Sequence, residues 1–139
     1  MTKDEWFDNL DSKEAYSYWN KLLNGYENVA DIKPLLKPTP CEYESKRRGL
    51  QISEDISKLI TELSVKYQIT DNIVFETAWG ITLQKYNYLE DVVFGKVVSG
   101  RNVPVRDVQS IVGLLTNTVP VRVSTEANQK ICDLLVKMQ

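Results

Sequence analysis

The chain has 139 residues, and its 42% hydrophobic and 26% charged residues are typical of one globular domain. At this length a single core can remove roughly 70% of the unfolded chain's surface from water. Seventeen basic and nineteen acidic residues give a formal charge of −2, which argues against a nucleic-acid partner or an anionic membrane surface.

The first predicted helix runs over residues 12–24. Asp11 and Glu14 have the spacing of a capping box, and apolar side chains then recur at helical intervals. Gly25 is placed to end this helix in the left-handed conformation. Three prolines make the segment that follows an extended connector, namely Pro34, Pro38 and Pro40.

A strand is predicted over Tyr43–Ile52, where bulky and polar residues alternate around Gly49. Ser53 then caps an amphipathic helix that ends near Tyr67, with Glu54 and Asp55 in its first turn. Its apolar side chains follow the i, i+3, i+4, i+7 pattern, namely Ile56, Leu59, Ile60 and Leu63.

Another helix, capped by Thr70 or Asp71, has apolar residues nearly all the way round its axis. We therefore expect it to be buried on more than one side, and we assign Trp79, like Trp19 of the first helix, to the core. Gly80 costs about 1 kcal/mol in a helix relative to alanine, which indicates that a neighbour packs closely there.

Val92–Val98 is a nearly continuous apolar run, which predicts a central strand covered on both faces. A break follows at residues 99–102, and a helix of about two turns is expected within Asp107–Leu115. Residues 118–123 alternate with a period of two, and Pro120 requires a position without a ladder donor, such as an edge. A last helical pattern begins at Ile131.

This order of elements predicts an α/β (α+β) fold in which helices pack on a mixed sheet. The last helical pattern lacks a stop signal, so we expect a chain truncated at both ends. Cys41 and Cys132 are far apart and there is no histidine, so we expect no metal, no bound organic cofactor, and free thiols in a reducing cytoplasm. No apolar stretch approaches the ~20 residues of a membrane span.

Three stretches stand in order along the chain, namely Tyr18–Leu23, Asp91–Arg101 and Ile111–Arg122. The first resembles the Y-W-x-x-x-L stretch of nonribosomal peptide synthetase condensation domains, and the second resembles their F-G-x-x-x-S-G-R strand. The third resembles their V-G-x-x-x-N-T-x-P-x-R motif and matches it at five positions, namely Gly113, Asn117, Thr118, Pro120 and Arg122. Together the three stretches resemble about a third of a complete condensation domain.

The resemblance implies a two-lobed chloramphenicol-acetyltransferase-like fold, of which residues 1–139 are a partial second lobe. In that family carrier-tethered substrates enter a tunnel between the lobes from opposite sides. The family's active-site H-H-x-x-x-D-G lies in the first lobe, and this chain has no histidine. We therefore expect no catalysis by the isolated chain, since no other group here is placed as a general base.

The resemblance assigns five residues to the wall of the substrate tunnel, namely Ser99, Gly100, Arg101, Asn117 and Thr118. Two of them also have simpler interpretations: Arg101 as a surface side chain that bonds turn carbonyls, and Asn117 as a turn former. Gly113, Pro120, Arg122 and Trp19 are expected to be structural, with Arg122 solvated or in a salt bridge.

The predicted function is that of a fragment whose parent joins aminoacyl and peptidyl groups held on phosphopantetheine arms, as in peptide antibiotic biosynthesis. The expected partners are the missing N-terminal lobe and carrier-protein domains, and an exposed apolar surface predicts self-association of the isolated fragment. Two alternatives remain open: a non-catalytic binding or docking module with the same fold, and part of another carrier- or CoA-dependent acyltransferase.

Overall fold

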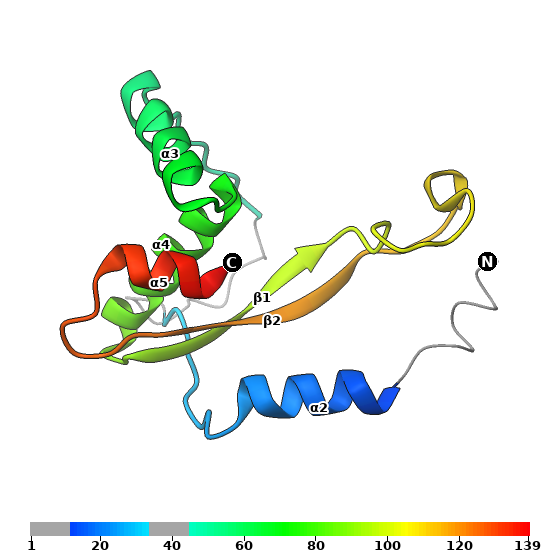
Figure 1. Cartoon of the computed structure of the whole chain (residues 1–139), viewed down its shortest axis with the longest axis horizontal. Coiled ribbons are helices and arrows are strands. Elements are labelled where there is room, and N and C mark those ends of the chain that lie inside the picture. Colours follow the sequence, from blue (N-terminus) through cyan, green and yellow to red (C-terminus); the bar gives the residue numbers. More distant parts are fainter. Residues whose placement is uncertain (1–11, 34–44) are drawn as a thin grey trace. The chain divides into compact units, whose positions relative to one another are not determined.

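The computed structural model describes residues 12–33 and 45–139, and Figure 1 shows its elements in chain order. They are helix α2 (Ser12–Leu23), helix α3 (Glu54–Tyr67), helix α4 (Asp71–Asn87), strand β1 (Asp91–Val98), the 3₁₀ turn η1 (Val108–Ser110), strand β2 (Asn117–Ser124) and helix α5 (Ile131–Met138). None of the helices in these two described ranges is both long and apolar enough to cross a membrane.

The chain divides into two compact units. Unit 1 contains the described residues up to Asn28 together with Val93–Arg122, and unit 2 contains the described residues of Val29–Val92 together with Val123–Gln139. Strands β1 and β2 contribute residues to both units. Helices α3, α4 and α5 belong to unit 2, whereas α2 and the loop between the strands belong to unit 1.

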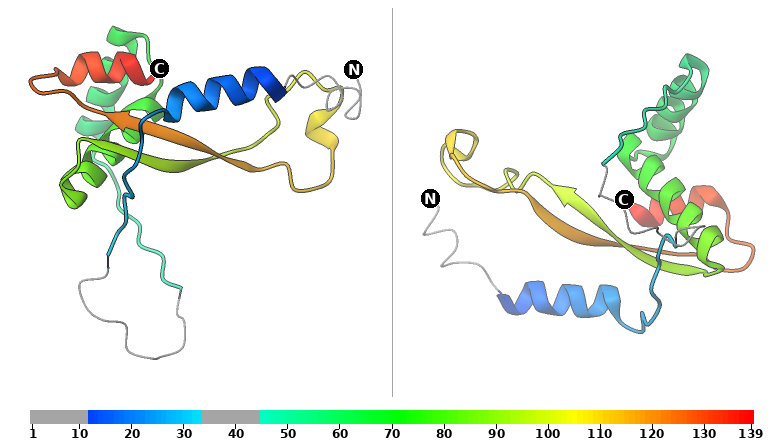
Figure 2. Two further views of the ribbon diagram at one scale, coloured as in Figure 1. Left: turned by 90° about the horizontal axis from the view of Figure 1, so that it is seen from below. Right: turned by 180° about the vertical axis from the view of Figure 1, so that it is seen from behind.

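Strands β1 and β2 pair in an antiparallel sheet, and Figure 2 shows their opposite directions. The amide of Thr125, just after β2, donates to the carbonyl of Glu90, just before β1, at 2.9 Å. The α+β class is thereby confirmed, but in the described residues the sheet has two strands and is not mixed. The expectation that β1 is covered on both faces is wrong, because buried Val92 is followed by half-buried and exposed side chains.

The core of unit 2 lies where the three helices meet. Ile69, in the turn before α4, and Ile73, in the first turn of α4, pack with Leu135 of α5, and partly buried Tyr67, Val74 and Met138 surround them. Helix α3 begins as the sequence predicts, since the Ser53 side chain accepts a hydrogen bond from the Ile56 amide at 3.4 Å. Its apolar face is nevertheless largely exposed in this chain, as at Ile56 and Leu59.

Helix α4 is buried along one side only. Its buried positions, Ile73, Thr77, Gly80, Leu83 and Gln84, lie on one face. The predicted close contact at Gly80 is confirmed, because a Cβ there would lie 2.7 Å from Cβ of Val123. The expectations of burial on more than one side and of Trp79 in the core are wrong, since Trp79 is 44% exposed.

The strand predicted over residues 43–52 does not form in the described part, where residues 45–52 have no regular structure and are exposed. The alternation is present, but no neighbouring strand is present in the described residues to supply the backbone partners that a strand requires. The predicted connector around Pro34, Pro38 and Pro40 lies outside the described residues, as do the capping residue Asp11 and the cysteine at position 41.

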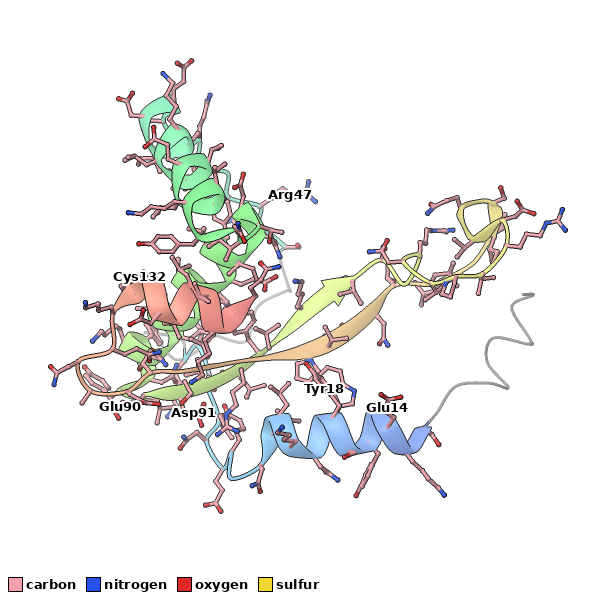
Figure 3. All side chains as sticks on the ribbon, in the orientation of Figure 1. Glu14, Tyr18, Arg47, Glu90, Asp91 and Cys132 are labelled. Atoms are coloured by element: carbon pink, nitrogen blue, oxygen red, sulfur yellow. The ribbon has the colours of Figure 1, made fainter. Side chains whose placement is uncertain are left out.

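Helix α2 ends as expected, with Gly25 at a φ of 70°. None of its residues is buried, and Trp19 is half-buried. The expectation that Trp19 is a core residue is therefore wrong. The Trp19 ring meets that of Tyr18 edge to face at 4.9 Å between centroids, and Tyr18 projects from the helix in Figure 3. A 12-residue helix without buried side chains is marginal alone, so contacts at its end must hold it.

Candidate functional site in the loop between the strands

The loop from Ser99 to Thr116 joins β1 to β2, and its two ends are in contact. Gly100, at a φ of 64°, lies so close to the Leu115 carbonyl that an added Cβ would overlap the oxygen and lie 3.0 Å from the carbonyl carbon. Glycine is required here for two reasons: the positive φ disfavours other residues, and the Leu115 oxygen leaves no room for a Cβ. The two ends of the loop therefore approach each other closely at this pair.

Arg101 braces the loop from within. Its Nη1 donates to the Val108 carbonyl at 2.6 Å, and its Nη2 donates to the Ile111 carbonyl at 3.2 Å. The two carbonyls belong to the first residue of η1 and to the residue directly after it, and η1 is shorter than the helix predicted within Asp107–Leu115. The Ser99 Oγ accepts from the Arg101 amide at 3.3 Å and so fixes the start of this turn. Because the guanidinium is charged, its two bonds to carbonyls are stronger than neutral hydrogen bonds.

The brace supports an apolar tip. Val112 is 100% exposed and Leu114 is 89% exposed, on either side of Gly113 at a φ of 150°. Val105, in contrast, is buried and anchors the other half of the loop. This tip was not among the expected site residues, although its sequence signal is two aliphatic residues on either side of a glycine.

Asn117 and Thr118 are the first two residues of β2, directly after the loop, and both are exposed. The Asn117 Oδ1 accepts from the Thr118 amide at 2.8 Å. Gly95 of β1 lies opposite, since a Cβ there would be 2.7 Å from Cγ2 of Thr118. The side-chain amide of Asn117 and the hydroxyl of Thr118 are therefore exposed at the base of the loop. These two groups can bind a polar group, but neither can act as a general base.

Arg122 caps helix α2, a role that the expectation of a solvated or salt-bridging side chain did not include. Its Nη1 donates to the carbonyls of Leu22 and Asn24, each at 2.8 Å, and its guanidinium lies 5.7 Å from the centre of the Tyr26 ring. The Tyr26 hydroxyl in turn accepts from the Val93 amide at 3.0 Å. A cation at the C-terminal end of a helix also complements its dipole. The aromatic residue directly after Gly25 was the signal for this contact.

We expect Arg122→Ala to release α2 from the strands of unit 1. The loss removes two hydrogen bonds with a charged donor, each worth about 1.5–3 kcal/mol, from a helix that has no buried residue to hold it. Hydrogen exchange at Leu23 and Tyr26 should accelerate while exchange in α4 is unchanged. Arg122→Lys should give partial protection, and equal protection in all three proteins would contradict the capping role.

Other polar groups do not extend the site. In the part of the chain that the structure describes, no three His, Cys, Asp or Glu residues are grouped to hold a metal ion. Cys132 lies on α5 and Arg47 on the segment before α3, so both belong to unit 2 (Figure 3). Glu90 and Asp91 mark the start of β1 in the same view, at the end opposite the loop.

Comparison with known proteins identifies the class. The model of the condensation domain family matches residues 5–139 of the chain. In structure, the first condensation domain of the CDA synthetase matches with a TM-score of 0.69 and 14% identity, over 95% of this chain and 29% of that chain. The same domain in complex with a substrate analogue gives a TM-score of 0.70.

The chain belongs to the condensation domain family of nonribosomal peptide synthetases. Bacitracin synthase 3 of Bacillus licheniformis is 33% identical over 135 residues, and surfactin synthase subunit 2 of Bacillus subtilis (strain 168) is 34% identical over 135 residues. Each alignment covers 97% of this chain but 2% and 4% of the two relatives. The chain therefore spans less than a third of a condensation domain and a small part of each synthase.

Proposed function

We propose that the chain is part of the second lobe of a condensation domain and supplies one wall of its substrate tunnel. The parent domain forms the peptide bond between aminoacyl and peptidyl groups that carrier proteins present on phosphopantetheine arms. The observation that carries the proposal is the loop braced by Arg101, which lies inside the family match and ends at Asn117 and Thr118. Exposed amide and hydroxyl groups at the base of a preformed loop suit contact with the amides of such an arm.

In this proposal the chain binds and positions but holds neither the catalytic base nor a cofactor. Its partners are the first lobe, which carries the catalytic histidines, and the loaded carrier proteins. Exposed apolar residues such as Val112 and Leu114 support weak self-association of the isolated chain. We propose the reducing cytoplasm as its compartment, a choice that the free thiol of Cys132 supports.

A complete domain is needed to test the proposal. We define the hybrid domain as the condensation domain of bacitracin synthase 3 with its 135 matched residues replaced by this chain. We expect the hybrid domain to form dipeptide from two loaded carrier proteins and the isolated chain to form none, because the isolated chain has no histidine. Dipeptide from the isolated chain, or none from a folded hybrid domain, would contradict the proposal.

Asn117→Ala in the hybrid domain tests the wall directly. We expect dipeptide formation to slow by roughly tenfold, since one buried hydrogen bond to the substrate is worth about 1–1.5 kcal/mol. Asn102→Ala, at an exposed residue of the same loop, is the matched control and should keep the original rate. Equal rates for the two variants would remove Asn117 from the substrate wall.

A further inference from the structure

Gly95 lies in the middle of strand β1, where the backbone does not require a glycine. The described glycines with a positive φ are Gly25, Gly100 and Gly113, and Gly95 is not among them. Glycine within a strand lowers stability, because it loses more chain entropy on folding than other residues and has no side chain to pack. The reason for a glycine at this position therefore lies in what approaches it.

One side chain approaches Gly95. A Cβ at this position would lie 2.7 Å from Cγ2 of Thr118, too close for an alanine unless one of the two residues moves. Within the residues that the structure describes, no other atom outside the adjacent residues of the chain lies within 4 Å of that position. The missing side chain of Gly95 thus leaves a seat for the methyl group of Thr118.

The position of the methyl group determines where the Thr118 hydroxyl points. Threonine is branched at Cβ, so its methyl and hydroxyl groups occupy different staggered positions about the same bond. With the methyl group against Gly95, the hydroxyl is directed away from Gly95. In the described part of the chain this hydroxyl has no hydrogen-bond partner, and the residue is exposed. Its proton is therefore available to a ligand.

We propose that Gly95 is a positioning residue, which seats the Thr118 methyl group so that the Thr118 hydroxyl donates to an amide carbonyl of the substrate arm. The inference rests on the proposed function, which places Thr118 in the wall of the substrate tunnel. Gly95 acts through Thr118 and needs no contact of its own with the arm. A hydroxyl that is already held in one rotamer loses less conformational freedom when the arm binds, which strengthens the contact.

The test is a double-mutant cycle in the hybrid domain. Gly95→Ala displaces the Thr118 methyl group and turns the hydroxyl, whereas Thr118→Val keeps the shape of the side chain and removes the hydroxyl. Each change should slow dipeptide formation roughly tenfold, as expected for one lost hydrogen bond to the substrate. The double variant should be no slower than Thr118→Val, because both changes remove the same bond. Effects that multiply, or either single variant at the original rate, would overturn the proposal.

A rescue variant separates positioning from distortion of the strand. Thr118→Ser removes the methyl group and keeps the hydroxyl, so adding Gly95→Ala to Thr118→Ser should leave the rate of Thr118→Ser unchanged. Gly49→Ala, at a position with no atom within 4 Å of the new Cβ, is the control and should keep the original rate. Urea unfolding shows whether each variant is folded. If Thr118→Ser fails to rescue Gly95→Ala, the alanine distorts β1 itself and the positioning role is wrong.

The same reaction distinguishes failure of this inference from failure of the tunnel wall. If Asn117→Ala slows dipeptide formation and Gly95→Ala does not, the wall stands and the role of Gly95 falls. If Gly95→Ala and Thr118→Val are slow and Asn117→Ala is not, Asn117 leaves the wall and the role of Gly95 stands. A folded hybrid domain that forms no dipeptide would overturn both proposals.

Discussion

Gly80→Ala should lower the free energy of unfolding by about 2 kcal/mol or more, although alanine is the better helix former by about 1 kcal/mol. The new methyl group would meet the Val123 side chain, with Cβ at 2.7 Å and Cγ1 at 2.9 Å. Val123 is fully buried and cannot rotate away. The helix and the strand would therefore have to separate.

Gly49→Ala is the matched control for this change, because no atom lies within 4 Å of a Cβ at Gly49. Urea unfolding followed by far-UV circular dichroism measures both variants. We expect the control to unfold at the original midpoint and Gly80→Ala well below it. A Gly80→Ala protein as stable as the control would mean that α4 and β2 are not in close contact.

Gln84 should be the most sensitive polar residue of unit 2. Its Nε2 donates to the carbonyls of Glu90 at 2.6 Å and Val123 at 3.0 Å, and its Oε1 accepts from the Thr125 hydroxyl at 3.4 Å. Gln84→Leu keeps the volume but removes the donor, and we expect a loss of about 1–3 kcal/mol because two backbone carbonyls lose a hydrogen bond in a buried place. Gln84→Glu should cost more at neutral pH, because it places a carboxylate against two carbonyl oxygens.

The pH dependence of Gln84→Glu has a definite sign. Burial raises the pKa of the introduced carboxyl in the folded state above its unfolded value of about 4.3. The variant should therefore be closest to the original protein below that unfolded value and lose stability as pH rises through the folded pKa. Gln51→Glu adds the same charge at an exposed residue and serves as the control. Parallel pH profiles for the two variants would contradict the buried role of Gln84.

Local patterns predicted most of the helices and strands. The Ser53 cap and the period of two before Ser124 depend on residues near one another in sequence. They were correct because capping and pleating act locally. Gly80 indicated from the helix alone that a neighbour packs closely, but not that this neighbour is Val123. The same patterns predicted a strand over residues 43–52, which requires a partner strand that the described residues do not provide.

Burial and long-range contacts could not be predicted in the same way. An apolar helix face shows that burial is favourable but not which surface covers it, so Trp79 was assigned to a core that the described residues do not form around it. Arg122 donates hydrogen bonds to the carbonyls of Leu22 and Asn24, which precede it by 100 and 98 positions in the sequence. No local pattern encodes such a pairing. Arg101 was predicted with two roles, and its bonds to turn carbonyls match the structural one.

The rate of dipeptide formation by Arg101 variants of the hybrid domain measures whether the braced loop positions the substrates. If the braced loop forms the tunnel wall, Arg101→Ala should slow the reaction tenfold or more, since a shift of about 1 Å in a positioning element can cost about 100-fold. The rate of Arg101→Lys should lie between those of Arg101→Ala and the original domain. Arg106→Ala, at an 86% exposed side chain of the same loop, should keep the original rate. An Arg101→Ala domain that works at the original rate would contradict the claim that this loop positions the substrates.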